Sequence, residues 1–342
     1  MSRDASEITS ELARNAEAVC RHYLPAGRRE GSYWIVGDIT NNPGRSLYVR
    51  LVGPAQGKGA AGKYTDGSTG EHGDLLDIIR ARTGIARFPD ILAEATRFLG
   101  LPAPVLVQEG GKFPERGKGD RGNHCETAGK LFRASVPVAG SLAEVYLASR
   151  GIRQKIDPAV LRFHPKCWHR DEGSDRAVPR PAMIAAVTDL AGNLQGVHRT
   201  WLAPDGKSKA DVTLQRRAMG NLLGNAVKFG QATDVAVVGE GIETMLSIRQ
   251  ALPHLPIWAA LSAGHLGAVQ FPKTVKQVYV AEGPDPAGRN AIERLRARSE
   301  SEGWSLCILT SRLGDFNDDL VAFGLVPLEA ELTAQLRRDT KP

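Results

Sequence analysis

The sequence predicts an α/β protein: a parallel sheet flanked by helices at the C-terminus, preceded by an α+β mixed-sheet domain and a small N-terminal αβ domain. Short apolar runs at residues 235–238, 257–261, 275–281 and 306–309 have the length of buried strands. Helical patterns of apolar residues follow the first and third runs after glycine-containing turns. Because strands that alternate with helices usually form parallel sheets, we expect these four strands to lie parallel.

Acidic residues follow three of these expected strands. Glu240 comes after the first, Asp285 after the third and Asp315 after the fourth. Since the carboxyl ends of parallel strands meet at one edge of a sheet, where open α/β sheets bind ligands, we expect these carboxylates to gather there. Carboxylates without cysteine or histidine among them suit a hard cation such as Mg²⁺. The same edge would receive Glu282, Asp318 and Asp319.

Each acid taken singly has a simpler explanation. A carboxylate in the first turn of a helix is favoured by the helix dipole, and this explanation suffices for Glu243. It accounts poorly for acids that follow three strands of one sheet.

Three acidic motifs, which begin at Glu240, Asp285 and Asp315, together resemble the Toprim domain shared by bacterial-type primases, topoisomerases and some nucleases. The similarity is nearest to the primase and primase-helicase proteins of plasmids and phages. It implies that Glu240 and Asp285 are catalytic. It also implies a Mg²⁺ or Mn²⁺ site made by Glu240, Asp285, Asp315 and Asp318.

One position departs from the family's pattern. The resemblance places the first member of an acidic pair at position 283, where this chain has Gly283. An ion held by fewer carboxylates binds more weakly, so a non-catalytic DNA-binding protein is an alternative. Glu282 lies one place earlier, and two orientations stay open for its side chain: toward the ion, or to the other side of the strand end.

The composition limits the class of protein. The 342 residues suffice for two or three domains, and a net charge of +6 with a pI near 9.2 favours a polyanionic partner without requiring one. The 4 cysteines lack the paired spacing of a disulfide framework or a zinc ribbon. No apolar run is long enough to span a membrane, and the acidic first residues differ from a signal peptide. We therefore expect a cytoplasmic protein with no membrane partner.

Residues 1–105 are expected to form the small αβ domain. A pair of strands followed by Gly73, an aspartate and an apolar helix resembles the zinc-binding domain of primases. The cysteines that would hold zinc are missing, so we expect no zinc, and we interpret His72 as a surface or hydrogen-bonded residue. A glycine-rich loop carries Lys58 and Lys63, which either contact DNA phosphates or are simply solvated.

The domain boundaries follow from composition. Residues 106–127 are rich in glycine and charge and poor in apolar residues, so we expect a flexible linker. Residues 128–232 are assigned to the mixed-sheet domain and residues 233–342 to the Toprim domain. We further expect one helix over residues 6–23 and a basic turn at residues 216–220.

By the same resemblance, the mixed-sheet domain presents basic residues toward the metal site, where they contact phosphates of template or nucleotide. Arg199 and Lys209 are assigned this role, since arginine grips a phosphate through a planar fork and lysine adds a mobile charge. The alternative places Arg199 on the outer face of an ordinary hairpin. His198 alternates with Arg199 along the strand, so we interpret it as structural. Lys207 and Arg216 are further candidates for nucleic-acid contact.

The resemblance implies a DNA primase-like nucleotidyltransferase that makes primers on single-stranded DNA by metal-dependent phosphoryl transfer, in plasmid or phage replication. Its expected partners are single-stranded DNA, nucleotides and a separate replicative helicase, since the loop at residues 57–63 lacks the P-loop pattern. Two alternatives stay open. One is a non-catalytic DNA-binding accessory with a degenerate Toprim site, and the other is a Toprim nuclease.

Overall fold

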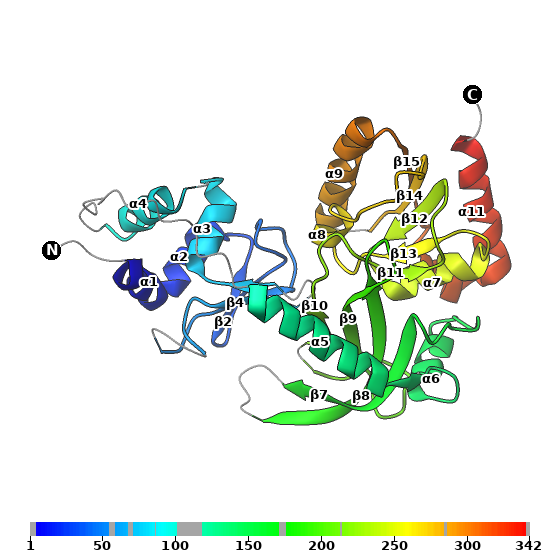
Figure 1. Ribbon diagram of the computed structural model, residues 1–342, viewed down its shortest axis with the longest axis horizontal. Coiled ribbons are helices and arrows are strands. Elements are labelled where there is room, and N and C mark those ends of the chain that lie inside the picture. Colours follow the sequence, from blue (N-terminus) through cyan, green and yellow to red (C-terminus); the bar gives the residue numbers. More distant parts are fainter. Residues whose placement is uncertain are drawn as a thin grey trace. The chain divides into compact units, whose positions relative to one another are not determined.

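The chain forms two compact units, residues 1–120 and residues 121–342. The computed structural model describes residues 5–54, 59–67, 71–85, 87–100, 118–170, 176–212, 214–283 and 286–339, with backbone alone at 118–124, 286–287 and 338–339. No helix in these described ranges is both long and apolar enough to cross a bilayer. Each unit is described by itself below (Figure 1).

The first unit packs four helices on a five-stranded antiparallel sheet of order β1-β2-β3-β4-β5. The helix expected over residues 6–23 is split at Asn15, whose backbone leaves helical geometry and whose side-chain amide donates to the carbonyl of Glu11. Asp74 caps the third helix by accepting from the backbone N–H of Leu76. The elements are α1 (Ala5–Arg14), α2 (Ala16–Tyr23), β1 (Arg28–Glu30), β2 (Tyr33–Val36), β3 (Leu47–Arg50), β4 (Tyr64–Asp66), β5 (His72–Gly73), α3 (Leu75–Thr83) and α4 (Phe88–Phe98).

The second unit begins with an antiparallel sheet of order β10-β9-β8-β7-β6. Two expectations fail here. Residues 118–127, expected within a linker, are helical, because the same helix continues to Ala128 and Phe132, which are buried against the sheet. Residues 216–220 form an edge strand instead of a turn. The elements are α5 (Lys118–Ala134), β6 (Val136–Pro137), α6 (Leu142–Ser149), β7 (Leu161–Arg170), β8 (Ala177–Thr188), β9 (Leu194–Trp201) and β10 (Arg216–Gly220).

A second sheet in this unit has the order β11-β13-β12-β14-β15. The four strands expected from the apolar runs are present and parallel. A short strand at residues 227–229, which the expected boundaries placed in the mixed-sheet domain, joins this sheet antiparallel to its neighbour. The elements are β11 (Val227–Phe229), β12 (Val235–Gly239), α7 (Ile242–Ala251), β13 (Ile257–Ala259), α8 (Ala263–Leu266), β14 (Gln277–Ala281), α9 (Pro286–Glu302), β15 (Ser305–Leu309), α10 (Phe316–Phe323) and α11 (Leu325–Asp339).

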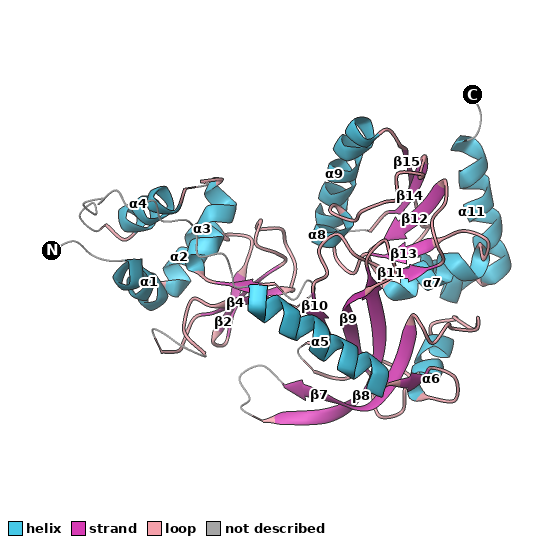
Figure 2. Cartoon of the chain, in the orientation of Figure 1, coloured by secondary structure: helices cyan, strands magenta, loops and turns pink. Residues whose placement is uncertain are grey.

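Helices cover both faces of the parallel sheet (Figure 2). Side chains alternate along each strand, so Val237 packs with Met245 of α7 on one face, while Val238 packs with Leu295 of α9 on the other. The core on the α7 side continues into the antiparallel sheet and includes Met183 of β8. The antiparallel sheet is therefore fixed against the α7 side of the parallel sheet by a shared hydrophobic core.

The loop between β15 and α10 is held by a buried acid. Asp319 is almost fully buried, and its carboxylate accepts hydrogen bonds from the backbone nitrogens of Arg312 and Leu313, each at 2.9 Å. A carboxylate that accepts two backbone N–H groups fixes the path of the chain between them. Asp319, which was expected among the acids at the sheet edge, therefore shapes the loop leading to Asp315.

We predict that Asp319→Ala lowers the free energy of unfolding by about 1–3 kcal/mol, because it leaves two backbone donors without their acceptor. Asp318→Ala is the matched control, since Asp318 is exposed one position earlier in the same helix. Urea unfolding measures both variants. Equal stabilities for the two variants would show that Asp319 does not hold the loop.

Candidate metal and nucleic-acid site

Glu240 lies at the carboxyl end of β12, and its carboxylate faces the end of β14. A Cβ atom added to Gly283 would lie 3.6 Å from Oε1 of Glu240, which is an ordinary van der Waals distance. A side chain at position 283 would therefore point toward the carboxylate of Glu240. The glycine leaves this position without the ligand that the family's acidic pair would supply.

Asp315 reaches the same edge from β15. It is the N-cap of α10, and its Oδ1 accepts from the backbone nitrogens of Asn317 at 2.7 Å and Asp318 at 2.9 Å. Its Oδ2 lies 3.3 Å from the hydroxyl oxygen of Thr244, which is in the first turn of α7. Because α7 begins two residues after Glu240, this contact brings the ends of β12 and β15 together.

The remaining acids expected at this edge contact other residues or lie outside the described part of the chain. Asp318 is exposed, and its Oδ1 lies 4.0 Å from Nη2 of Arg150. The carboxylate of Glu282 accepts from the hydroxyl of Thr310 at 3.5 Å, so it turns toward the end of β15. Asp285, the other acid assigned to this edge, lies outside the described residues.

The acids in the described residues fit a divalent cation only in part. Glu240 and Asp315 supply hard oxygen donors at one edge, as Mg²⁺ and Mn²⁺ require. Within the described ranges, however, no three His, Cys, Asp or Glu side chains lie close enough to hold an ion together. A complete site needs further ligands, for which Asp285 and Asp318 are the candidates that the sequence offers.

The structure places Arg199 away from this edge, so the expectation that it faces the acids is wrong. Arg199 donates to the backbone carbonyls of Arg217 and Ala218, and its guanidinium lies over the ring of Trp201, 5.1 Å from the ring centre. Trp201 packs on the side of the sheet covered by α5. Burial lowers the pKa of Arg199 to about 10.

His198 and Arg216 face the other way, toward α7. His198 pairs across the sheet with Ala185 and Ala218, which belong to the core on the α7 side. Burial, then the charge of Arg216, lowers the pKa of His198 to about 3, so its imidazole is neutral. Arg216 pairs with Thr200, two residues along β9 from His198, and its side chain is exposed on that face.

Lys209 contacts Glu243, which was expected to be an ordinary acid in the first turn of a helix. Its Nζ lies 3.1 Å from Oε1 of Glu243, and the hydroxyl of Tyr146 donates to the same oxygen. Burial by itself would raise the pKa of Glu243, but Lys209, then Arg216, then the Tyr146 hydroxyl hold it at about 2. The carboxylate is therefore ionised although it is only 7% exposed.

Three residues near the edge were missed as functional candidates: Tyr146, Arg150 and Glu243. The available signal was the position of Glu243, which lies between Ile242 and Met245 in the buried stripe of α7. An acid within an apolar stripe needs a buried cation as partner. Arg150 is placed by its backbone carbonyl, which accepts from the side-chain amide of Asn317 at 2.7 Å.

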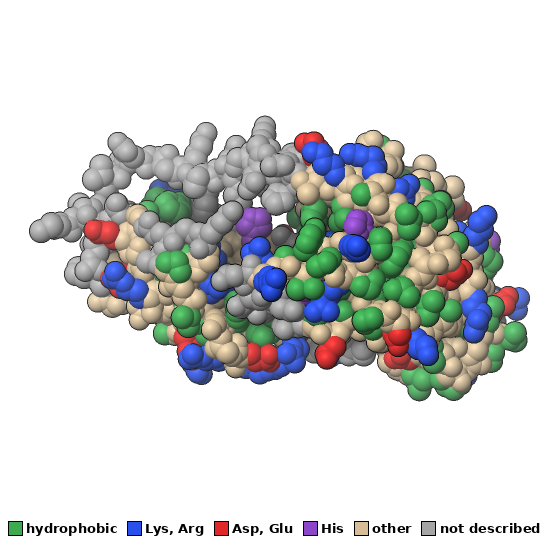
Figure 3. All heavy atoms as spheres, turned by 90° about the horizontal axis from the view of Figure 1, so that it is seen from below, with side chains coloured by type: hydrophobic (Ala, Val, Ile, Leu, Met, Phe, Trp, Pro, Cys, Tyr) green, Lys and Arg blue, Asp and Glu red, His purple; other side chains and the backbone are tan. Residues whose placement is uncertain are grey.

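The other basic candidates show no contact with the edge among the described interactions. Lys207 is exposed, and its backbone carbonyl accepts from the hydroxyl of Ser149. In the first unit, Lys63 is exposed and lies 3.2 Å from Asp74, while Lys58 lies outside the described residues. Figure 3 shows basic and acidic side chains interspersed over one face of the molecule, so charge alone does not mark a nucleic-acid surface there.

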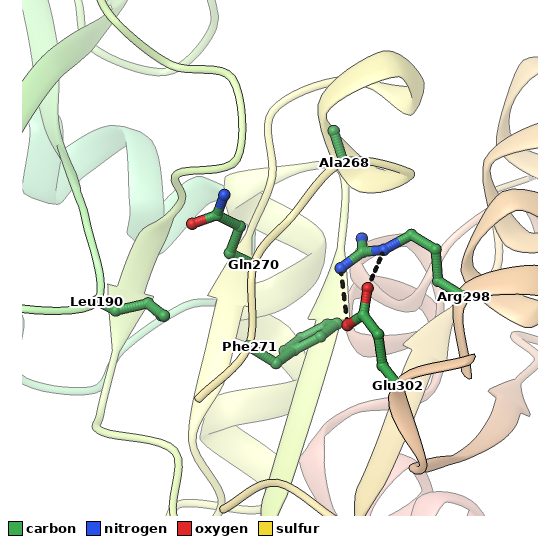
Figure 4. Close-up of a pocket in the computed structure, with 6 residues that line it drawn as sticks. All are labelled: Leu190, Ala268, Gln270, Phe271, Arg298 and Glu302. Carbon is green, nitrogen blue, oxygen red and sulfur yellow. Dashed lines mark hydrogen bonds and ion pairs between the residues drawn. The ribbon is translucent and has the colours of Figure 1, made fainter. Parts of the chain in front are cut away.

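A pocket of about 410 Å³ lies at the opposite end of the parallel strands (Figure 4). Phe271 precedes β14, and Arg298 and Glu302 end α9 just before β15, so the pocket is at the amino edge of the sheet. Arg298 pairs with Glu302 at 2.9 Å and donates to the carbonyls of Gly267 and Val269. The guanidinium thus joins α9 to the loop before β14, and the pocket is separate from the acids.

We predict that ionised Glu243 makes stability depend on pH below the ordinary carboxyl range. Its folded pKa, about 2, is below the ordinary value of 4.5, so its contribution is present above pH 4.5 and is lost as the pH falls toward 2. Glu243→Gln should flatten the curve of unfolding free energy against pH across this window. Glu300→Gln, an exposed acid of α9, should leave the curve unchanged. Parallel curves for wild type and Glu243→Gln would contradict the ionised state.

Two family profiles match the chain. Residues 235–325 match the Toprim domain, and residues 123–229 match a domain of unknown function (DUF7146). No curated protein sequence matches the chain.

Three solved structures are similar to this chain at low sequence identity. The zinc-binding and RNA polymerase domains of the Aquifex aeolicus primase are 16% identical, with a TM-score of 0.43 over 96% of this chain and 85% of that one. A DNA primase domain from Pseudomonas aeruginosa is 15% identical, with a TM-score of 0.43 over 61% and 78%. The DnaG catalytic core is 17% identical, with a TM-score of 0.44 over 62% and 78%.

The identification rests on the Toprim profile together with the geometry. The profile covers all four parallel strands, whose spatial order is β13-β12-β14-β15, and Asp315 contacts Thr244 of α7 at their carboxyl edge. Residues 235–325 of this chain are a Toprim domain.

Proposed function

We propose that this chain is a primase-like nucleotidyltransferase that extends a primer on single-stranded DNA. The observation that supports the proposal is that Glu240 and Asp315 both lie at the carboxyl edge of the Toprim sheet, where Asp315 contacts the first turn of α7 through Thr244. Arg150 and Lys209 of the mixed-sheet domain lie beside Asp318 and Glu243 of the Toprim domain. Acids at such an edge suit a divalent cation, and the neighbouring cations suit the phosphates that it would act on.

The roles of the acids follow from their positions. Glu240, Asp285, Asp315 and Asp318 are the residues we propose to hold Mg²⁺ or Mn²⁺. When bound, the ion lowers the charge that opposes attack of a 3′ hydroxyl on a triphosphate. As an alternative role, we propose that the Glu240 carboxylate accepts the proton of that hydroxyl.

The cations that we propose for phosphate contact are Arg150, Lys209 and Arg216. Arg150 replaces Arg199 in this role, because Arg150 lies beside Asp318, whereas Arg199 is half-buried on the α5 side of the antiparallel sheet. An arginine supplies a planar pair of donors to a phosphate, and a lysine supplies a point charge. Lys207, Lys58 and Lys63 stay proposals for weaker contact with the DNA backbone.

We also propose the setting of the reaction: plasmid or phage replication in the cytoplasm, with single-stranded DNA and nucleotides as substrates and a helicase as a separate partner. What supports it is the resemblance of the acidic motifs to primases of mobile replicons, together with the Toprim match.

A second candidate function is a non-catalytic DNA-binding accessory. Gly283 favours it, because the position that faces Glu240 carries no side chain. A Toprim nuclease is a third candidate that uses the same edge. Incubation with DNA in the presence and absence of nucleotides separates these functions, since only a nuclease shortens DNA without nucleotides and only a primase requires them.

We predict that Glu240→Gln and Asp285→Asn each reduce primer synthesis by about 100-fold or more, because each removes a carboxylate that we propose to hold the metal ion. The assay is incorporation of labelled nucleotides on a single-stranded template with Mn²⁺. Glu300→Gln is the control for the same chemical change at an exposed site of α9. Undiminished product from both edge variants would remove the proposal.

We predict that Gly283→Asp tightens Mn²⁺ binding by about tenfold, since it adds a carboxylate beside Glu240. The added Cβ meets Glu240 only at van der Waals distance, so the backbone should tolerate it. Ser301→Asp, on the exposed face of α9, controls for the added charge. Isothermal titration measures both. Affinity that is unchanged or weaker in Gly283→Asp would show that position 283 does not face the ion.

A further inference from the structure

One buried carboxylate connects three separate segments of the second unit. Glu243 belongs to α7 of the Toprim domain, Tyr146 to α6, and Lys209 to the segment between β9 and β10. Tyr146 is 2% exposed and donates its hydroxyl to Glu243, and the side chain of Lys209 is 24% exposed at 3.1 Å from the same oxygen. The Toprim domain thus fixes a side chain that belongs to the mixed-sheet domain.

The backbone at Lys209 is set by its own domain. Ala203 donates to the carbonyl of Ser208, and Lys209 forms a bridge with Leu202. The hydroxyl of Ser149 donates to the carbonyl of Lys207, which ties the same loop to α6. Only the ammonium group is placed by Glu243, so the two ends of this side chain are held by different domains.

Glu243 lies only a few residues from the proposed metal ligand Glu240 at the carboxyl edge of the Toprim sheet. Glu243 follows Glu240 by three residues, and α7 begins between them. Because the first turn of α7 is rigid helix, the ammonium of Lys209 has a fixed place relative to Glu240.

The cations around Glu243 outnumber the acids, so this group of residues could also bind an anion. Glu243 is one buried acid, and Lys209 and Arg216 are the two cations whose charges act on it most strongly. These three residues together carry one net positive charge, and the side chain of Arg216 is exposed on the sheet face that turns toward α7. A phosphate that met both cations would complete the balance.

We propose that Glu243 is a positioning residue for phosphate binding, which holds the ammonium of Lys209 beside the metal edge. The inference rests on the proposed function for the identity of the phosphate, which belongs to nucleic acid. It goes beyond that function by assigning a role to Glu243 and Tyr146, both of which are buried. A purely structural role, in which the ion pair only joins two domains, is the alternative.

The experiment is a lysine footprint, in which an amine-acylating reagent modifies the folded protein and mass spectrometry gives the extent at Lys209. The probe is oligodeoxythymidine, with binding followed separately by fluorescence anisotropy. In wild type, the oligonucleotide should protect Lys209 several-fold, while Lys276, at the amino edge of the sheet, should stay unprotected. A wild-type Lys209 that the oligonucleotide does not protect would overturn the proposal.

Glu243→Gln distinguishes the positioning role of Glu243 from a purely structural one, because protection of Lys209 and overall affinity for the oligonucleotide should change in different directions. It retains an acceptor for Tyr146 but removes the charge that places Lys209, so protection of Lys209 should be lost. Overall affinity for the oligonucleotide should hold or rise, because the surface gains one net positive charge. Protection equal to wild type in this variant would leave Glu243 with a structural role only and overturn the proposal.

Glu243→Asp keeps the charge but withdraws it by one methylene, so Lys209 should be protected to an intermediate extent. This variant replaces Glu243→Gln in the test if thermal unfolding shows that Glu243→Gln is not folded. Full protection in Glu243→Asp would also contradict the proposal, because it would show that the position of the carboxylate does not matter. The footprint does not depend on primer synthesis. Failure of synthesis with an intact footprint would therefore reject the proposed function and leave the positioning role standing.

Discussion

Parallel pairing of β12, β14 and β15 is the constraint on which the candidate site depends. The register places Val238 beside Val280 and Ala281 beside Leu309, so the three strands end together. The residue that follows each strand therefore arrives at one edge, whatever the length of chain between them. The contact between Thr244 and Asp315 shows that the starts of α7 and α10 lie together at this edge.

A second constraint fixes the neighbouring domain to this edge. Burying a carboxylate costs free energy unless cations and hydrogen bonds accompany it, and Glu243 has both, from Lys209 and Tyr146. The shared apolar core supplies adhesion between the sheets, but apolar contact has no preferred direction. The ion pair supplies direction, since it is satisfied only when the β9–β10 segment lies over the first turn of α7.

The four parallel strands and the helices after the first and third of them were predictable, because apolar runs, glycine turns and strand direction determine them. The shared metal site of Glu240 and Asp315 stays a prediction. The sheet face on which each side chain of β9 lies was not predictable. The alternation of side chains along a strand predicts that His198 and Arg199 point to opposite faces of the sheet. Only the packing of Trp201 on the α5 side determines that Arg199 lies on that face and His198 on the α7 side. Glu243 was missed because its partner is distant in sequence. The helix from 118 was missed because its first residues resemble a linker, while Ala128 and Phe132 anchor it.

The central claim is that carboxylates from separate strands share one divalent cation at the carboxyl edge. Crystals of the protein soaked in Mn²⁺, with anomalous diffraction recorded at the manganese edge, test it most directly. We expect one strong peak within ligand distance of the carboxylates of Glu240 and Asp315, about 2.2 Å for oxygen donors. A manganese peak elsewhere on the molecule, with Glu240 and Asp315 bound only to protein and water, would contradict it.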